Sequence, residues 1–195
     1  MRSVLRPLVA VTPLFLAACE TPPPADEFAE ITFLNRDRIR LDVAEIVVDN
    51  LYVSPRKDGF VEHEFPIDPG ATAARWAKDR LEAVGTDGRL TVSIIEASVQ
   101  EVALEMKTGI EGLVTTEQSE RYDGLIVMTL EAENVSRRIS ASARGEVRRS
   151  QTVPENITLA GRERVWYEMT ERMMTDLDTV MTKNVNTHLG DFLVR

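Results

Sequence analysis

The chain has few of the residues from which proteins build reactive sites: one cysteine, Cys19, and two histidines, His63 and His188, in 195 residues. A single cysteine excludes a disulfide within the chain, so stability must come from the burial of apolar side chains. Neither histidine has a partner at the spacing of known zinc motifs. Glu62 and Glu64 flank His63, but in an extended chain they point away from it, which favours a polar loop. His188 fits the end of a helix, so we expect no metal site.

Motifs of catalysis are missing as well. The sequence has no Gly-x-Ser-x-Gly nucleophile elbow, and neither GTDG nor GIEG continues into the Lys-Ser/Thr of a phosphate-binding loop. Carboxylates are abundant, but the sequence singles out no pair of them for acid–base chemistry. We therefore expect a protein that is not an enzyme and needs no cofactor, with an enzyme as the weaker alternative.

Positive charge is also scarce: the chain has 23 basic and 32 acidic residues, and its formal net charge is −9. Removal of residues 1–18 as a signal segment would take away Arg2 and Arg6 but no acid, and the net charge would become −11. Nonspecific binding to nucleic acid depends on Lys and Arg neutralising phosphates, so we expect no nucleic-acid partner. The composition, 43% hydrophobic, is sufficient for one packed core.

The cysteine lies at the end of an apolar N-terminal stretch. Arg2 and Arg6 precede a mostly apolar run, 8–16, which is shorter than the about 20 residues that span a bilayer. This order is typical of a removed signal segment, here 1–18. Leu16-Ala17-Ala18-Cys19 resembles the lipobox of bacterial lipoproteins. The resemblance implies diacylglycerol on the thiol of Cys19, cleavage just before it and acylation of the new amine, for example with palmitate; a buried or free thiol is the alternative.

A Pro-rich, acidic stretch follows the cysteine, and we expect residues 19–36 to form a lipid anchor and an extended tether. Two or more acyl chains hold a protein stably on a membrane. Residues 37–195 are expected to form one periplasmic domain. Glu20 occupies the position where an Asp keeps lipoproteins of enteric bacteria in the inner membrane. Glu20 in place of that Asp favours the outer membrane, with the inner membrane as the weaker alternative.

Alternating apolar and polar residues predict a mostly antiparallel sheet. We expect strands over 39–53, with a bulge near Ala44, over 89–106, with a change of phase at Ile94-Ile95, and over 122–133 and 137–149. The last two form a hairpin with one face in water. Loops are expected over 54–70 and 107–124.

Two helices complete the predicted fold. The first covers 71–85, with Gly85 as a left-handed cap. The second follows an N-cap at Thr158, carries a Met-rich apolar stripe to Phe192 and should bend or break near 182–186, because it is long for a small domain. We expect the stripe to face the sheet; a partner-binding surface is the alternative. The prediction is an α+β two-layer sandwich, with four to five strands and both helices on one face.

One region is basic against the acidic background. The segment from Arg137 to Arg164 contains seven arginines and only three glutamates. Arg144 and Arg148 fall on the wet face of the last strand, beside Arg149. The planar guanidinium suits phosphate, so these three arginines are a candidate site for an anion such as a lipid headgroup. The alternative interpretation, which we favour, is a charged strand face that keeps the protein dispersed.

The order of strands and helices after the tether resembles, in architecture only, small lipoproteins of the Gram-negative envelope. Among these are the auxiliary lipoproteins of ABC-type lipid-transport systems and the lipoprotein that plugs the lipopolysaccharide-export barrel. The resemblance implies a membrane-anchored, non-catalytic accessory or interaction subunit of an envelope transport or assembly system, with an envelope protein as partner. The alternative is a binding module for an anionic lipid or glycolipid headgroup.

The anchor can be tested directly. Replacing Cys19 with Ser removes the thiol to which diacylglycerol would be attached, so we expect the variant to take up no labelled fatty acid and to keep its N-terminal segment. Metabolic labelling and the mass of the purified chain measure both effects. Incorporation of labelled fatty acid by the Cys19→Ser variant would contradict the lipobox interpretation.

Overall fold

The computed structural model describes residues 28–105 and 118–194. Its strands are β1 (Ile39–Leu41), β2 (Glu45–Asn50), β3 (Leu81–Ala83), β4 (Arg89–Ala103), β5 (Gln118–Asn134) and β6 (Ile139–Pro154). The helices are α1 (Pro69–Arg80) and α2 (Leu159–His188), with short 3-10 turns η1 (Glu62–Glu64) and η2 (Gly190–Phe192).

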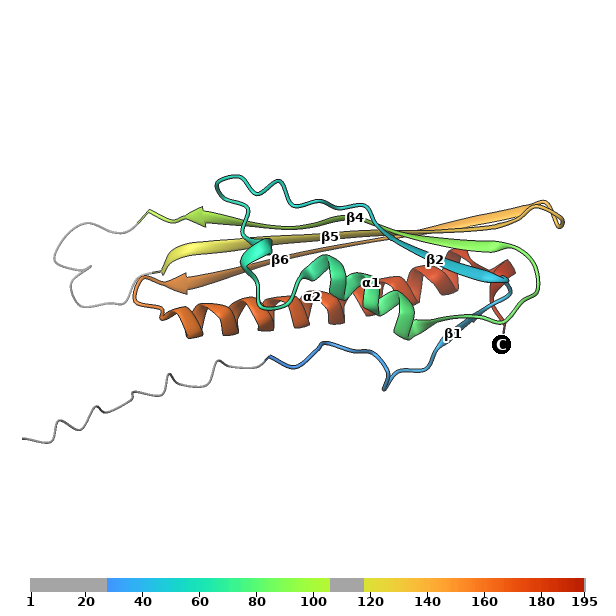
Figure 1. The fold of residues 1–195 in the computed structure, drawn as a ribbon, viewed down its shortest axis with the longest axis horizontal. Coiled ribbons are helices and arrows are strands. Elements are labelled where there is room, and N and C mark those ends of the chain that lie inside the picture. Colours follow the sequence, from blue (N-terminus) through green and yellow to red (C-terminus); the bar gives the residue numbers. More distant parts are fainter. Residues whose placement is uncertain (1–27, 106–117, 195) are drawn as a thin grey trace, which may run out of the picture.

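These elements form two layers. Four strands make one sheet in the order β2-β4-β5-β6, in which β2 runs parallel to β4 and the other pairs are antiparallel. Both α1 and α2 lie on one face of this sheet (Figure 1). The predicted α+β fold, with a mostly antiparallel sheet under two helices, is confirmed.

The segment 39–53, predicted as one bulged strand, is divided between two sheets. β1 pairs with β3 in a separate parallel pair, whereas β2 joins the large sheet. Between them the N–H of Asp42 donates to Phe192 O at 2.7 Å, and that of Ala44 donates to Gly88 O at 3.0 Å. The loss of alternation near Ala44 therefore marks a change of sheet and not a bulge, because the backbone finds other partners there.

The first helix ends earlier than predicted. Asp68 caps its start by accepting a hydrogen bond from Ala71 N at 2.7 Å, and Leu81 is already extended. The apolar positions that suggested a longer helix belong partly to β3, because pairing with β1 buries Leu81. Gly85 is not a left-handed cap: a Cβ there would lie 2.7 Å from the carbonyl carbon of Asp42, so this position allows two segments to approach closely.

The sheet contains two long strands joined as a hairpin. The change of phase predicted at Ile94-Ile95 is a β-bulge, since Ile94 pairs with Met128 and Glu96 with Val127. β5 begins at Gln118, so the last seven residues of the loop predicted over 107–124 are strand, and the rest of it lies outside the described residues. The hairpin of β5 and β6 is confirmed, and its strands of 17 and 16 residues extend about 55 Å.

This hairpin explains why α2 needs no break. Its 30 residues form a continuous helix of about 45 Å, which fits along the hairpin, so the interruption predicted near 182–186 is absent. Thr158 is the N-cap, as predicted, and accepts a hydrogen bond from Gly161 N at 3.1 Å. Most of the stripe is buried, including Met169, Met173 and Met181. The methionines are therefore core residues and not a partner-binding surface.

The chain between 28 and 36 lies along the helix side of the domain (Figure 1). Ile31 and Phe33 are buried, and the ring of Phe28 stacks on Tyr167 of α2 with centroids 5.0 Å apart. Apolar residues two positions apart give an extended segment one apolar side, which here joins the core. Packing therefore begins within the predicted tether, before Asp37.

Two glycines on the covered sheet face allow α2 to lie close to the hairpin. A Cβ on Gly124 of β5 would come within 2.7 Å of the Cε of Met169 and the Sδ of Met173. A Cβ on Gly145 of β6 would overlap Met181 more severely. The methionine side chains fill the space that these glycines leave, so helix and sheet interlock at two points.

We expect Gly145→Ala to lower the free energy of unfolding by about 1–3 kcal/mol, because Met181 must leave its position in a filled core. Gly190→Ala is the matched control, since a Cβ there has no neighbour within 4 Å. Its effect should stay within about 0.5 kcal/mol. Urea denaturation of the two variants measures the difference, and equal effects would show that helix and sheet are not in close contact at Gly145.

Candidate functional site

The three arginines nominated from the sequence do not form one cluster. Arg144 and Arg148 lie on the sheet face away from the helices, but Arg149 points to the other face, where its Nη2 donates to Asp176 of α2 at 2.8 Å. Alternation along β6 explains this separation, because residues at odd numbers in this part of the strand face the helices.

Arg144 and Arg148 share one carboxylate. Glu146 lies between them on the same face and accepts hydrogen bonds from Arg148 Nη2 at 2.8 Å and Arg144 Nη2 at 3.4 Å. The hydrogen bond and charge of Arg148, with a smaller effect of Arg144, hold the pKa of Glu146 below its ordinary value. Each nominated arginine thus already has an acidic neighbour. Anion binding at Arg144, Arg148 and Arg149 stays a prediction.

The histidines lie apart. His63 is in η1, with its Nε2 3.8 Å from Glu64 Oε1, so the turn brings together two side chains that an extended chain would separate. His188 is the last residue of α2, as expected. Within residues 28–105 and 118–194, no three His, Cys, Asp or Glu side chains gather in a group that could hold a metal ion.

Glu62, next to His63, is a buried acid that the sequence did not distinguish from its neighbours. It is 2% exposed, accepts a hydrogen bond from Tyr52 Oη at 2.8 Å and another from Val99 N at 3.1 Å, and so fastens η1 to β4. Burial raises the pKa of Glu62, but hydrogen bonds from Ser54, Tyr52 and the backbone lower it more, and the net pKa is below the ordinary value. Its contribution to stability is lost as the pH falls through that lowered pKa.

A second buried acid joins the two helices. Asp178 of α2 accepts a hydrogen bond from the indole Nε1 of Trp76 at 2.8 Å and one from Arg80 Nε at 2.7 Å. Arg80 is the last residue of α1, and its Nη2 donates to Thr182 Oγ1 at 3.0 Å. Arg80 is only 5% exposed and Asp178 8%. Residues about a hundred positions apart thus form one buried polar network.

This network borders a groove of about 650 Å³, which we call the basic groove. One wall is α2, with Asp178, Thr182 and Asn186 four residues apart on one side of the helix. Segment 36–40, which leads into β1, and the C-terminal residues 193–194 form the other wall. The N–H of Val194 donates to Arg40 O at 3.0 Å, which holds these two segments together.

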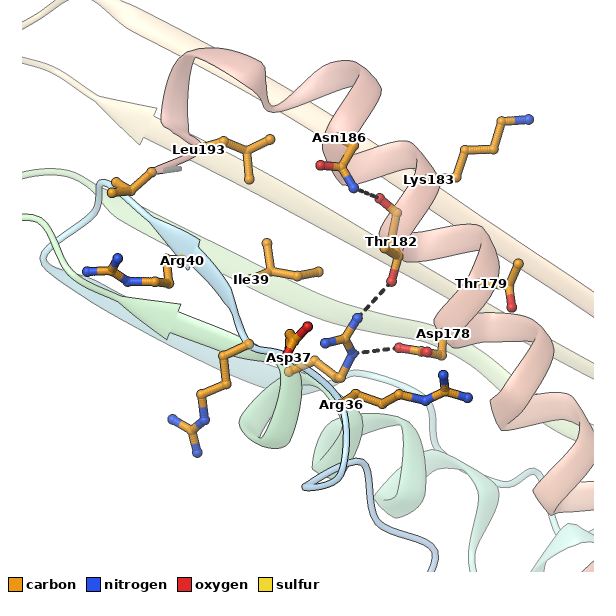
Figure 2. A pocket seen from close by; sticks show the side chains of 13 residues that line it. Arg36, Asp37, Ile39, Arg40, Asp178, Thr179, Thr182, Lys183, Asn186 and Leu193 are labelled. Atoms are coloured by element: carbon orange, nitrogen blue, oxygen red, sulfur yellow. Dashed lines mark hydrogen bonds and ion pairs between the residues drawn. The ribbon is translucent and has the colours of Figure 1, made fainter.

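Cations dominate the lining of the basic groove. The lining has two acids, Asp37 and Asp178, and five basic residues, an excess of three positive charges. The basic residues are Arg36, Arg38, Arg40, Arg80 and Lys183. Figure 2 shows Arg36 reaching across the groove toward Asp178 and Lys183 on the outer side of α2. Sequence reasoning missed this site. Its visible signal was the concentration of three arginines within residues 36–40.

The buried network should dominate the stability of the contact between the helices. We expect Asp178→Ala to lower the free energy of unfolding by about 3–5 kcal/mol, because it leaves the Arg80 guanidinium buried without its carboxylate. Adding Arg80→Met should recover part of this loss. Glu168→Ala, which removes an exposed partner of Arg172 on the same helix, is the control and should cost at most about 0.5 kcal/mol. Equal losses for Asp178→Ala and Glu168→Ala in urea denaturation would contradict this role.

No protein-family model and no curated protein sequence matches the chain. Solved structures that resemble it include rare lipoprotein B from Shewanella oneidensis, with 10% identity and a TM-score of 0.39 over 73% of this chain and 95% of that one. A minor lipoprotein from Acinetobacter baumannii has 7% identity and a TM-score of 0.37 over 78% and 96% of the two chains. A DUF330 protein from Xanthomonas campestris has 10% and 0.32 over 77% and 90%. At these values the likeness carries no argument about function.

Proposed function

We propose that this chain is a lipid-anchored protein of the Gram-negative envelope, facing the periplasm from the outer membrane, whose domain acts without catalysis as an accessory or interaction subunit of a transport or assembly system. The anchor part of the proposal is supported by the sequence at Leu16–Cys19, which lies outside the described residues. None of the helices in the described ranges has the length and apolar character needed to cross a membrane.

The chain between the anchor and the domain is short. Phe28, whose ring already packs on α2, lies nine positions after Cys19. Fully extended, nine residues reach at most about 32 Å. A domain anchored in this way stays within that distance of the membrane surface, where it can meet other proteins of the same membrane.

The observation that carries the interaction part is a group of exposed apolar side chains at one edge of the sheet, which we call the edge cluster: Leu51, Val53 and Ile95. Leu51 and Val53 follow β2, and the N–H of Leu51 donates to Ile94 O at 3.0 Å, next to the bulge residue Ile95. Leu51 is 60%, Val53 81% and Ile95 41% exposed. Apolar groups that gather at a strand edge are typical of contacts with another protein.

The uncovered sheet face is a less suitable contact surface. Val127 points to this face but is only 4% exposed, and its neighbours across the strands are Glu96 and Glu146. On the same face Arg121 donates to Asp123 at 2.8 Å. Antiparallel sheets commonly turn such a polar face to water. The edge cluster therefore offers a partner more apolar surface than the uncovered sheet face does.

We expect a photo-crosslinking amino acid at position 51 or 53 of the lipidated protein to give one discrete adduct in living cells. Position 135 is the matched control, because Val135 is 76% exposed but lies in the turn between β5 and β6. The adduct should disappear when Leu51 and Val53 are both changed to Asp, a change that leaves the melting temperature nearly unaltered because both side chains are exposed.

The Cys19→Ser variant should also lose the adduct, since it lacks the lipid that would hold it at the outer membrane. Equal crosslinking at positions 51 and 135, or an adduct that survives the double Asp substitution, would rule out the edge cluster as the contact.

A further inference from the structure

The basic groove concentrates positive charge in a protein of opposite charge. The whole chain carries −9, yet the groove lining carries an excess of three cations. Arg36 and Arg38 are exposed, and in the described part of the chain no acid forms an ion pair with either side chain or with Lys183. Surface arginines elsewhere, such as Arg75, Arg137 and Arg148, have carboxylates within 3 Å. The groove therefore holds cations that the fold itself does not neutralise.

Arg80 adds a buried donor without an acceptor. Its Nε and Nη2 are used by Asp178 and Thr182, but its Nη1 is buried and has no hydrogen-bond partner among the described residues. A buried donor left without an acceptor costs free energy, and a charged one costs more. Asp178 and Thr182 fix the orientation of the guanidinium, and Arg80 is held in place as a residue of the groove lining.

The shape and remaining lining of the groove restrict the ligand. Its volume of about 650 Å³ lies within the range of small-molecule sites. Thr179 and Asn186 on α2 supply polar groups, whereas Ile39 and Leu193 supply an apolar wall. A ligand with an anionic end and a less polar body matches this combination.

From these observations we propose that the basic groove binds a phosphate-bearing ligand, with Arg80 at its inner border and Arg36 and Arg38 at its rim. The planar guanidinium presents donors in the geometry of phosphate oxygens. This site is distinct from the edge cluster. It is also distinct from Arg144 and Arg148, since those two arginines lie on the other side of the sheet. The proposal does not depend on the proposed function.

Glycerol 3-phosphate and phosphatidic acid carry the same phosphomonoester, one as a free molecule and the other as a lipid headgroup. The full chain in nonionic detergent is titrated with glycerol 3-phosphate, and in parallel its micelles are doped with phosphatidic acid or with phosphatidylcholine. Binding raises the melting temperature with ligand concentration. We expect saturable stabilisation by at least one phosphomonoester, none by phosphatidylcholine, and weaker binding as the salt concentration rises.

Two double variants with the same loss of charge locate the site. Arg36→Ser with Arg38→Ser should weaken binding at least tenfold, whereas Arg144→Ser with Arg148→Ser, on the other side of the sheet, should change it less than twofold. All four side chains are exposed, so both variants fold, and Arg80→Lys gives a further readout at the inner border.

Stabilisation by both phosphomonoesters supports the site for free and lipid-borne phosphate alike, and stabilisation by phosphatidic acid alone restricts it to headgroups. Absence of stabilisation by either, or equal weakening in the two double variants, would overturn the proposal.

Discussion

The buried carboxylate of Asp178 holds together the part of the molecule in which its two helices meet. Placing a charge there is costly unless it is paired, and Asp178 meets this requirement with donors from both Trp76 and Arg80 of α1. The pairing also fixes Arg80, which donates a further hydrogen bond to Thr182 and lines the groove. The contact that joins the helices is thus the same contact that sets one side of the basic groove, so stability and the candidate binding surface depend on one residue.

A second constraint is the length of the β5–β6 hairpin. A small domain with strands of ordinary length could not support a 30-residue helix, but strands of 16 and 17 residues give α2 a sheet to lie on along its whole length. Gly124 and Gly145 bring the helix close enough for methionine side chains to fill the interface. Because Met is unbranched and flexible, it suits a surface where the missing glycine side chains leave irregular gaps.

The fold class could be predicted from local patterns, because alternation and the 3.6-residue stripe report which side of an element is buried. The phase change at Ile94 was visible for the same reason, and Thr158 was visible as an N-cap because its hydroxyl can accept a hydrogen bond from the first turn of a helix. The division of 39–53 between two sheets was not visible, since it depends on hydrogen bonds to Phe192 and Gly88, far along the chain. For the same reason the sequence could not show that Leu81 leaves the helix to pair with β1, or that the helix end at Arg80 faces Asp178.

The contrast between the two groups of arginines shows where composition stops being informative. The run from Arg137 to Arg164 drew attention because its basic residues are close in sequence, yet Arg144 and Arg148 share Glu146, and Arg149 reaches Asp176. The arginines of the basic groove come from segments at least forty residues apart, and two of them, Arg36 and Arg38, form no ion pair with an acid of the described residues. What decides whether a cation is available to a ligand is its local set of partners, which only the folded chain defines. An acidic net charge therefore does not argue against an anion site, because most of the acids that produce it lie outside the groove.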